Sequence, residues 1–121
     1  MILYHGSTNP ELCRAAVTAT RGGGKHVKPG RVCAGFYATP SREEAQQYAD
    51  MTTGPSFVYI LALSTRANVQ PYDGDITRIS ESTAANLRAQ GVDAITGQDI
   101  RGRFEVCILE PRAITHMSIS Q

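Results

Sequence analysis

Apolar residues in this chain gather in short runs that polar and glycine-rich segments separate. The clearest run is FVYILAL at 57–63, which consists of β-branched, aromatic and aliphatic residues and is therefore typical of a buried strand. Shorter runs of the same kind, each bounded by polar or turn-forming residues, also indicate strands. The predicted strands occupy residues 2–5, 32–39, 56–64, 92–96, 104–110 and 113–120.

Three other segments place their apolar residues at helical spacing. Thr39 or Ser41 can cap a helix, and Ser41 has the capping-box spacing to Glu44, which predicts a helix start. Asn9 followed by Pro10 marks a second start, since proline is well tolerated in the first turn. Gly91 marks a stop, because glycine commonly follows the last helical residue. The predicted helices lie within residues 9–20, 40–51 and 75–91.

The order of these elements predicts the fold class. Helices come early, strands cluster late, and no unit of strand plus helix repeats. We therefore expect an α+β fold with largely antiparallel strands rather than a doubly wound parallel sheet. Because no linker, repeat or change in composition divides the chain, residues 1–121 are interpreted as one domain.

Composition narrows the classes of function. The 121 residues are 41% hydrophobic, which is enough for one globular core. The formal net charge of +1 gives no strong electrostatic attraction for a nucleic acid or an anionic membrane. The apolar runs are too short to span a bilayer, and no basic segment followed by an apolar stretch opens the chain. We therefore expect a cytoplasmic protein, or an effector that acts in the cytosol of a target cell.

The cysteines and histidines do not form a recognisable metal site. Cys13, Cys33 and Cys107 are odd in number and form no C-x-x-C pair, which argues against both a disulfide framework and a structural zinc. His26 and His116 have no potential ligands at useful spacing. No metal is therefore expected.

The segment RGGGKHVKPGR at 21–31 is rich in glycine and carries four cations. It matches neither of the common glycine-rich phosphate-binding motifs, and taken alone it is typical of a surface loop. Alongside a dinucleotide site, the same glycines and cations would suit a flap that meets a pyrophosphate. We expect this segment to contact a dinucleotide or an acceptor.

A histidine, two tyrosines and a glutamate lie at the boundaries of predicted elements. His5 ends the first strand and Gly6 follows it. Tyr37 lies near the end of a later strand, Tyr48 lies on the following helix, and Glu105 lies near the start of an apolar strand. This set suits a bound nicotinamide ribose. Cleavage of NAD at its glycosidic bond creates positive charge on the ribose, which a nearby carboxylate stabilises, as in glycoside hydrolysis. Aromatic rings can enclose the nicotinamide, and a glycine allows the backbone to approach its carboxamide.

Each of these residues also has a purely structural interpretation. A histidine in a strand is usually structural, and the two tyrosines would ordinarily be packing residues. Glu105 is the exception, because a carboxylate within an apolar strand is costly unless it has a partner or faces a cleft. The combination of all four favours the functional interpretation.

Three stretches carry a resemblance to a known family. Motifs of the His–Tyr–Glu class of ADP-ribosyltransferases are resembled by YHGS, within residues 3–7, by GFYATPSREEAQQYA, at 35–49, and by DAITGQDIRGRFEVCIL, at 93–109. That class includes the toxins similar to diphtheria toxin and exotoxin A, and the poly(ADP-ribose) polymerases. The resemblance implies two packed, mostly antiparallel sheets with flanking helices and an NAD cleft between the sheets.

The resemblance also implies roles for individual residues. His5 would orient the nicotinamide ribose and Gly6 would hold the carboxamide, with Ser7 beside them in the set that binds NAD. The rings of Tyr37 and Tyr48 would stack on the nicotinamide. The catalytic set implied by the resemblance is Glu105, His5 and Tyr37, with Glu105 as the catalytic carboxylate.

The expected activity is mono-ADP-ribosyl transfer from NAD to an unidentified acceptor, with a protein as first expectation and a nucleic acid as an open alternative. An NAD glycohydrolase and a catalytically silent module that binds NAD or ADP-ribose are the two other interpretations. The arginine-directed branch of the class carries a second glutamate two residues before the catalytic one. This chain has Arg103 there, which disfavours arginine as the acceptor.

Overall fold

The computed structural model describes residues 1–8, 10, 35–51, 54–99 and 101–120. Over these residues the chain forms an α+β structure with seven strands in two sheets and two α-helices, which confirms the predicted fold class. The predicted helix at 9–20 (apart from Pro10) and the predicted cationic segment at 21–31 lie outside the described residues.

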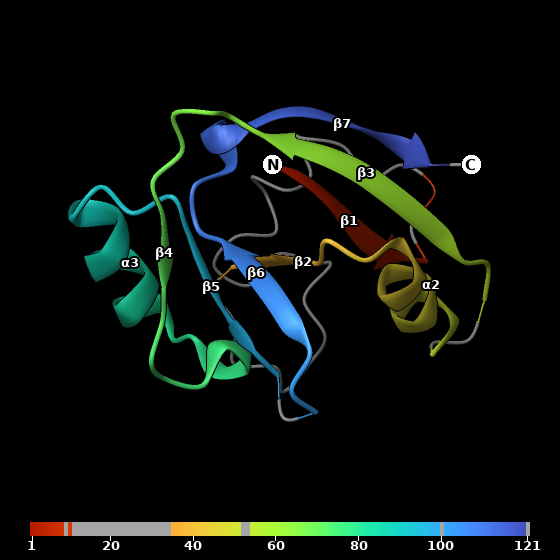
Figure 1. Cartoon of the computed structure of the whole chain (residues 1–121), viewed down its shortest axis with the longest axis horizontal. Coiled ribbons are helices and arrows are strands. Elements are labelled where there is room, and N and C mark those ends of the chain that lie inside the picture. Colours follow the sequence, from red (N-terminus) through yellow and green to blue (C-terminus); the bar gives the residue numbers. More distant parts are fainter. Residues whose placement is uncertain (9, 11–34, 52–53, 100, 121) are drawn as a thin grey trace.

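The first sheet has three strands and is wholly antiparallel. Its order is β1 (Ile2–Ser7), β3 (Phe57–Leu63), β7 (Ile114–Ser120), so the first and last strands both flank the apolar run predicted as a strand. Figure 1 shows this sheet crossing one side of the molecule. These strands confirm three of the sequence predictions.

The second sheet has four strands in the order β2 (Phe36–Ala38), β6 (Phe104–Ile108), β5 (Ala94–Gln98), β4 (Val69–Pro71). The β2–β6 and β5–β6 pairs are antiparallel, whereas β4 and β5 are parallel. Strand β4 was not predicted, because it has only three residues and one of them is Pro71.

A backbone bridge between Tyr4 and Thr39 joins the two sheets. Tyr4 of β1 and Thr39, the residue after β2, exchange two backbone hydrogen bonds of 2.7 and 2.9 Å. The bridge places the end of β1, where His5 follows Tyr4, beside the second sheet.

The two faces of the second sheet pack against different hydrophobic clusters. One face meets the first sheet through a core that includes Leu3, Leu61 and Val106. The opposite face carries a second cluster, which includes Ile95 and Cys107. Strand β6 therefore lies between two cores, which explains why four of its five residues are buried.

The helices lie at opposite ends of the long axis of the molecule (Figure 1). Helix α2 (Arg42–Asp50) is capped by Ser41, whose side chain accepts a hydrogen bond from the Glu44 backbone N–H, so Ser41 rather than Thr39 is the capping residue of the two predicted. Helix α3 (Glu81–Ala89) ends before Gly91, whose φ of +83° suits glycine.

Two short 3₁₀ helices, η1 (Ile76–Arg78) and η2 (Pro111–Ala113), complete the described elements. Neither was predicted, since one helical turn leaves no periodic pattern. Within the described part of the chain, no helix has both the length and the hydropathy needed to cross a membrane.

Candidate active site

Strand β6 holds Glu105 on the face of the sheet that carries the second hydrophobic cluster. Glu105 and Cys107 share this face because they are two residues apart on one strand. Tyr37 of β2 pairs directly with Cys107, so its side chain lies on the same face. Only 4% of Glu105 is exposed, and a carboxylate this buried requires polar partners.

One polar partner of Glu105 comes from helix α2. The Tyr48 hydroxyl donates a hydrogen bond of 2.6 Å to Oε1 of Glu105. Hydrogen bonds to a charged acceptor are shorter and stronger than neutral ones, so this contact is well suited to hold the carboxylate. The structure thus joins two of the predicted site residues that lie on different elements.

A second carboxylate, Asp99, lies beside the same hydroxyl and was missed by the sequence analysis. Its Oδ2 lies 3.1 Å from the Tyr48 hydroxyl oxygen. Its Oδ1 accepts hydrogen bonds from the backbone N–H groups of Arg101, at 2.8 Å, and Arg103, at 2.9 Å. Asp99 is therefore fixed by the turn between β5 and β6. An aspartate three residues before Gly102 is a readable turn signal, but it does not reveal what the carboxylate faces.

The surroundings of Tyr48 and Asp99 shift the pKa values of these two residues in opposite directions. Burial, followed by the hydrogen bond to Glu105, raises the pKa of Tyr48 well above its ordinary value. Burial alone would raise the pKa of Asp99, but hydrogen bonds from the backbone N–H groups of Arg103 and Arg101 outweigh it and lower that pKa. Near neutral pH, a neutral tyrosine hydroxyl therefore lies beside an ionised Asp99.

The His5 side chain forms a hydrogen bond to the backbone of strand β2. Its Nδ1 lies 2.6 Å from the Tyr37 backbone carbonyl oxygen, and a carbonyl only accepts, so Nδ1 carries the proton. In the neutral ring Nε2 is then the acceptor nitrogen. The imidazole also stacks on Phe36, with ring centroids 4.1 Å apart and planes inclined by 30°. These two contacts fix the orientation of the His5 ring.

Gly6 has a packing role that the sequence did not indicate. A Cβ atom at this position would collide with the Ala45 carbonyl oxygen and lie 2.8 Å from the Ala49 backbone nitrogen, both in α2. Glycine therefore allows helix α2 to lie directly on β1, which brings Tyr48 within reach of Glu105. Ser7 is the last residue of β1 and is half-buried.

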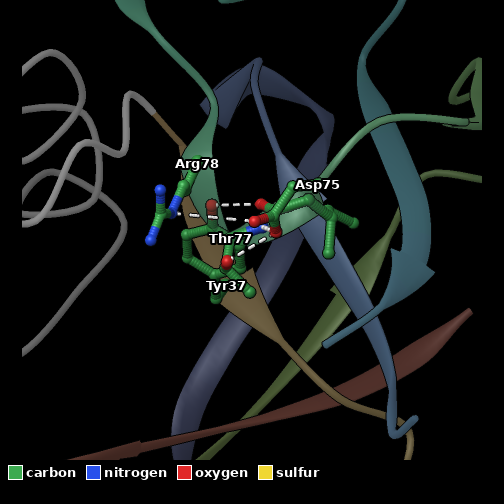
Figure 2. A network of polar contacts seen from close by, with 5 residues as sticks. Tyr37, Asp75, Thr77 and Arg78 are labelled. Atoms are coloured by element: carbon green, nitrogen blue, oxygen red, sulfur yellow. Dashed lines mark hydrogen bonds and ion pairs between the residues drawn. The ribbon is translucent and has the colours of Figure 1, made fainter. Parts of the chain in front are cut away.

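The Tyr37 ring packs against the second hydrophobic cluster, and its hydroxyl donates a 2.5 Å hydrogen bond to the Ile76 carbonyl oxygen of η1. Figure 2 shows this contact beside Asp75, Thr77 and Arg78. The Asp75 side chain caps η1 by accepting from the Thr77 backbone N–H at 2.9 Å. Tyr37 thus has a polar anchor in addition to its ring, whereas the expectation from the sequence was that it acts mainly through the ring.

Arg103 lies in the turn before β6, which begins at Phe104. Because Arg103 lies outside the strand, the alternation of side chains along β6 does not show whether its half-buried side chain points to the same face as Glu105. Its positive charge contributes to lowering the pKa of Asp99, the carboxylate with which its backbone N–H also forms a hydrogen bond.

No group of three or more potential metal ligands occurs among the described residues. Cys107 is buried in the second cluster, whereas Cys13, Cys33 and His26 lie outside the part of the chain that the structure describes.

The site residues predicted from three separate stretches thus lie on adjoining elements. Tyr48 contacts Glu105 directly, His5 contacts the backbone of Tyr37, and Tyr37 shares a sheet face with Glu105. No protein-family model matches the chain, and no curated protein is significantly similar to it.

Proposed function

We propose that the chain is an NAD-dependent mono-ADP-ribosyltransferase that cleaves the nicotinamide glycosidic bond and transfers ADP-ribose to a macromolecular acceptor. A protein is the acceptor that we expect first. The observation that carries the proposal is the hydrogen bond of 2.6 Å between Tyr48 and Glu105, two residues picked out by the motif resemblance and 57 positions apart in sequence. The attachment of His5 to the Tyr37 backbone supports the same assignment.

The chemistry of these groups suits NAD as a substrate. Loss of nicotinamide leaves positive charge on the ribose, and Glu105 supplies a carboxylate to oppose it. Because Glu105 is only 4% exposed, water screens its charge weakly. The tyrosines offer aromatic surface, and His5 offers a ring nitrogen with an orientation set by Phe36 and the Tyr37 carbonyl. In this proposal NAD is held by His5, Gly6, Ser7, Tyr37 and Tyr48, with Glu105, His5 and Tyr37 as the catalytic set.

The test combines two measurements on the purified chain. Free nicotinamide released from NAD reports cleavage, and radiolabel from adenylate-labelled NAD that appears on proteins of a cell extract reports transfer. Glu105→Gln should lower both by about 10²–10³-fold, because the substitution keeps the shape and removes the charge that opposes the developing cation. Affinity for NAD should change much less, since that charge forms mainly in the transition state.

Glu43→Gln is the matched control, since Glu43 is an exposed carboxylate in the first turn of α2. Circular dichroism and thermal unfolding establish that both variants fold. Nicotinamide release without labelled protein or nucleic acid would make the chain an NAD glycohydrolase, and NAD binding without release would make it a silent module. Wild-type rates in a folded Glu105→Gln variant would refute the catalytic assignment.

A further inference from the structure

We propose that Asp99, Tyr48 and Glu105 work as one unit in which the Tyr48 hydroxyl bridges two carboxylates and holds Glu105 in its reactive position. Tyr48 and Asp99 are then positioning residues, and Tyr48 acts through its hydroxyl as well as its ring. The inference deepens the proposed function and rests on it for the reaction. The bridge itself is testable without any activity.

The distances show how the single hydroxyl proton is shared. A tyrosine hydroxyl donates one proton, yet two carboxylate oxygens lie within hydrogen-bonding distance of it. The contact with Glu105, at 2.6 Å, is much shorter than the contact with Asp99, at 3.1 Å, so the proton is directed mainly at Glu105. Asp99 therefore competes for the proton and adds negative charge beside Glu105.

The turn before β6 fixes the position of Asp99. Both hydrogen bonds to Oδ1 come from backbone N–H groups, those of Arg101 and Arg103, and Gly102 closes the turn with a φ of +79°. The Gly102 N–H also donates to the Asp99 carbonyl at 2.9 Å, and the Asp99 N–H donates to the Arg103 carbonyl at 2.9 Å. Because Oδ1 is held in this way, Oδ2 is the oxygen presented to Tyr48.

Two substitutions should move the titration of Glu105 in opposite directions. Tyr48→Phe keeps the ring but removes the donor that stabilises the Glu105 carboxylate, so Glu105 should protonate at higher pH. Asp99→Asn keeps an oxygen for the Arg101 and Arg103 N–H groups but removes a neighbouring negative charge, so Glu105 should protonate at lower pH. Each midpoint should move by about one pH unit, which corresponds to a tenfold change in the ionisation constant.

Other titratable groups occur on the elements around Glu105, so its carboxyl must be observed directly. They include Cys107 on β6, His5 on β1, Tyr37 on β2, Glu44 on α2, and Arg101 and Arg103 in the turn. A bulk pH–rate profile would mix their effects with that of Glu105.

The experiment uses the full chain with carbon-13 in the glutamate carboxyl groups. The NMR signal of Glu105 is identified by its loss in Glu105→Gln, and its titration midpoint is measured in wild type, Tyr48→Phe and Asp99→Asn. Tyr72→Phe and Asp73→Asn are matched controls, since Tyr72 packs against the second cluster and Asp73 is exposed before η1. Nicotinamide release is measured in parallel, and Tyr48→Phe should lower kcat about tenfold with a smaller change in KM.

Opposite shifts of the Glu105 midpoint, with none in the controls, would support the unit. Midpoints that do not move, or that move in the same direction in both variants, would overturn it. A wild-type chain that releases no nicotinamide but shows the opposite shifts would refute the proposed function and leave the bridge intact. An active wild type whose Tyr48→Phe variant keeps the wild-type midpoint and kcat would refute the bridge alone.

Discussion

Replacement of Gly6 by alanine tests how the fold brings the proposed site together. The added Cβ would lie 2.8 Å from the Ala49 backbone nitrogen and 3.0 Å from the Ala45 carbonyl carbon. These are backbone atoms of helix α2, so no side-chain rotation relieves the collision and the helix itself must move. Overpacking of this kind costs about 3 kcal/mol. For a chain of 121 residues, this loss should lower Tm by about 10 °C.

The same movement should reach the active site. Helix α2 carries Tyr48, whose hydroxyl lies 2.6 Å from Glu105, and a shifted helix lengthens that contact. Gly6→Ala should therefore lower kcat for nicotinamide release in addition to stability, whereas a glycine that served only to hold the carboxamide of NAD would affect KM.

The assays are urea unfolding and thermal unfolding without NAD, followed by kcat and KM for nicotinamide release at a temperature where the variant is folded. Gly91→Ala is the control, because a Cβ there meets nothing within 4 Å and strain arises only from its φ of +83°. It should cost about 1 kcal/mol and leave kcat unchanged. A Gly6→Ala variant as stable as wild type, with a raised KM alone, would refute the packing argument and favour direct contact with NAD.

Three further predictions concern the site. Tyr37→Phe should lower the free energy of unfolding in urea by about 1 kcal/mol, because the Ile76 carbonyl loses its hydrogen-bond donor. Its KM for NAD should stay at the wild-type value, whereas Tyr37→Ala should raise KM sharply. Equal KM values in the two variants would show that the Tyr37 ring does not stack on NAD. The raised pKa of Tyr48 means that the folded state favours the neutral hydroxyl, so this stabilisation is present below the unfolded value of about 10 and is lost as pH rises towards the folded pKa. Stability measured from pH 9 to 11 should accordingly decline less in Tyr48→Phe than in wild type, and equal slopes would contradict the assignment. Agmatine should accept no ADP-ribose, since Arg103 stands where the arginine-directed branch has a glutamate; labelling of agmatine that depends on Glu105 would refute this.

Local patterns in the sequence were enough to predict most of the described elements. The strand predicted at 56–64 is β3, which is one residue shorter at each end, and Ser41 caps α2 as its spacing with Glu44 predicted. These predictions succeeded because strand propensity and helix capping depend on residues that are close in sequence. The edge strand β4 and the two 3₁₀ helices were not predicted, because each has only three residues and so few residues form no recognisable local pattern.

The sequence by itself identified His5, Gly6, Tyr37, Tyr48 and Glu105 as a candidate set, and the predicted α+β class is confirmed. Only the tertiary structure determined which of these residues contact one another. The contact between Tyr48 and Glu105 spans 57 positions, and that between Tyr48 and Asp99 spans 51, and both exist because α2 lies close on β1 beside the second sheet. Such contacts depend on strand pairing and helix docking between distant segments, which hydrophobic periodicity along the chain does not encode.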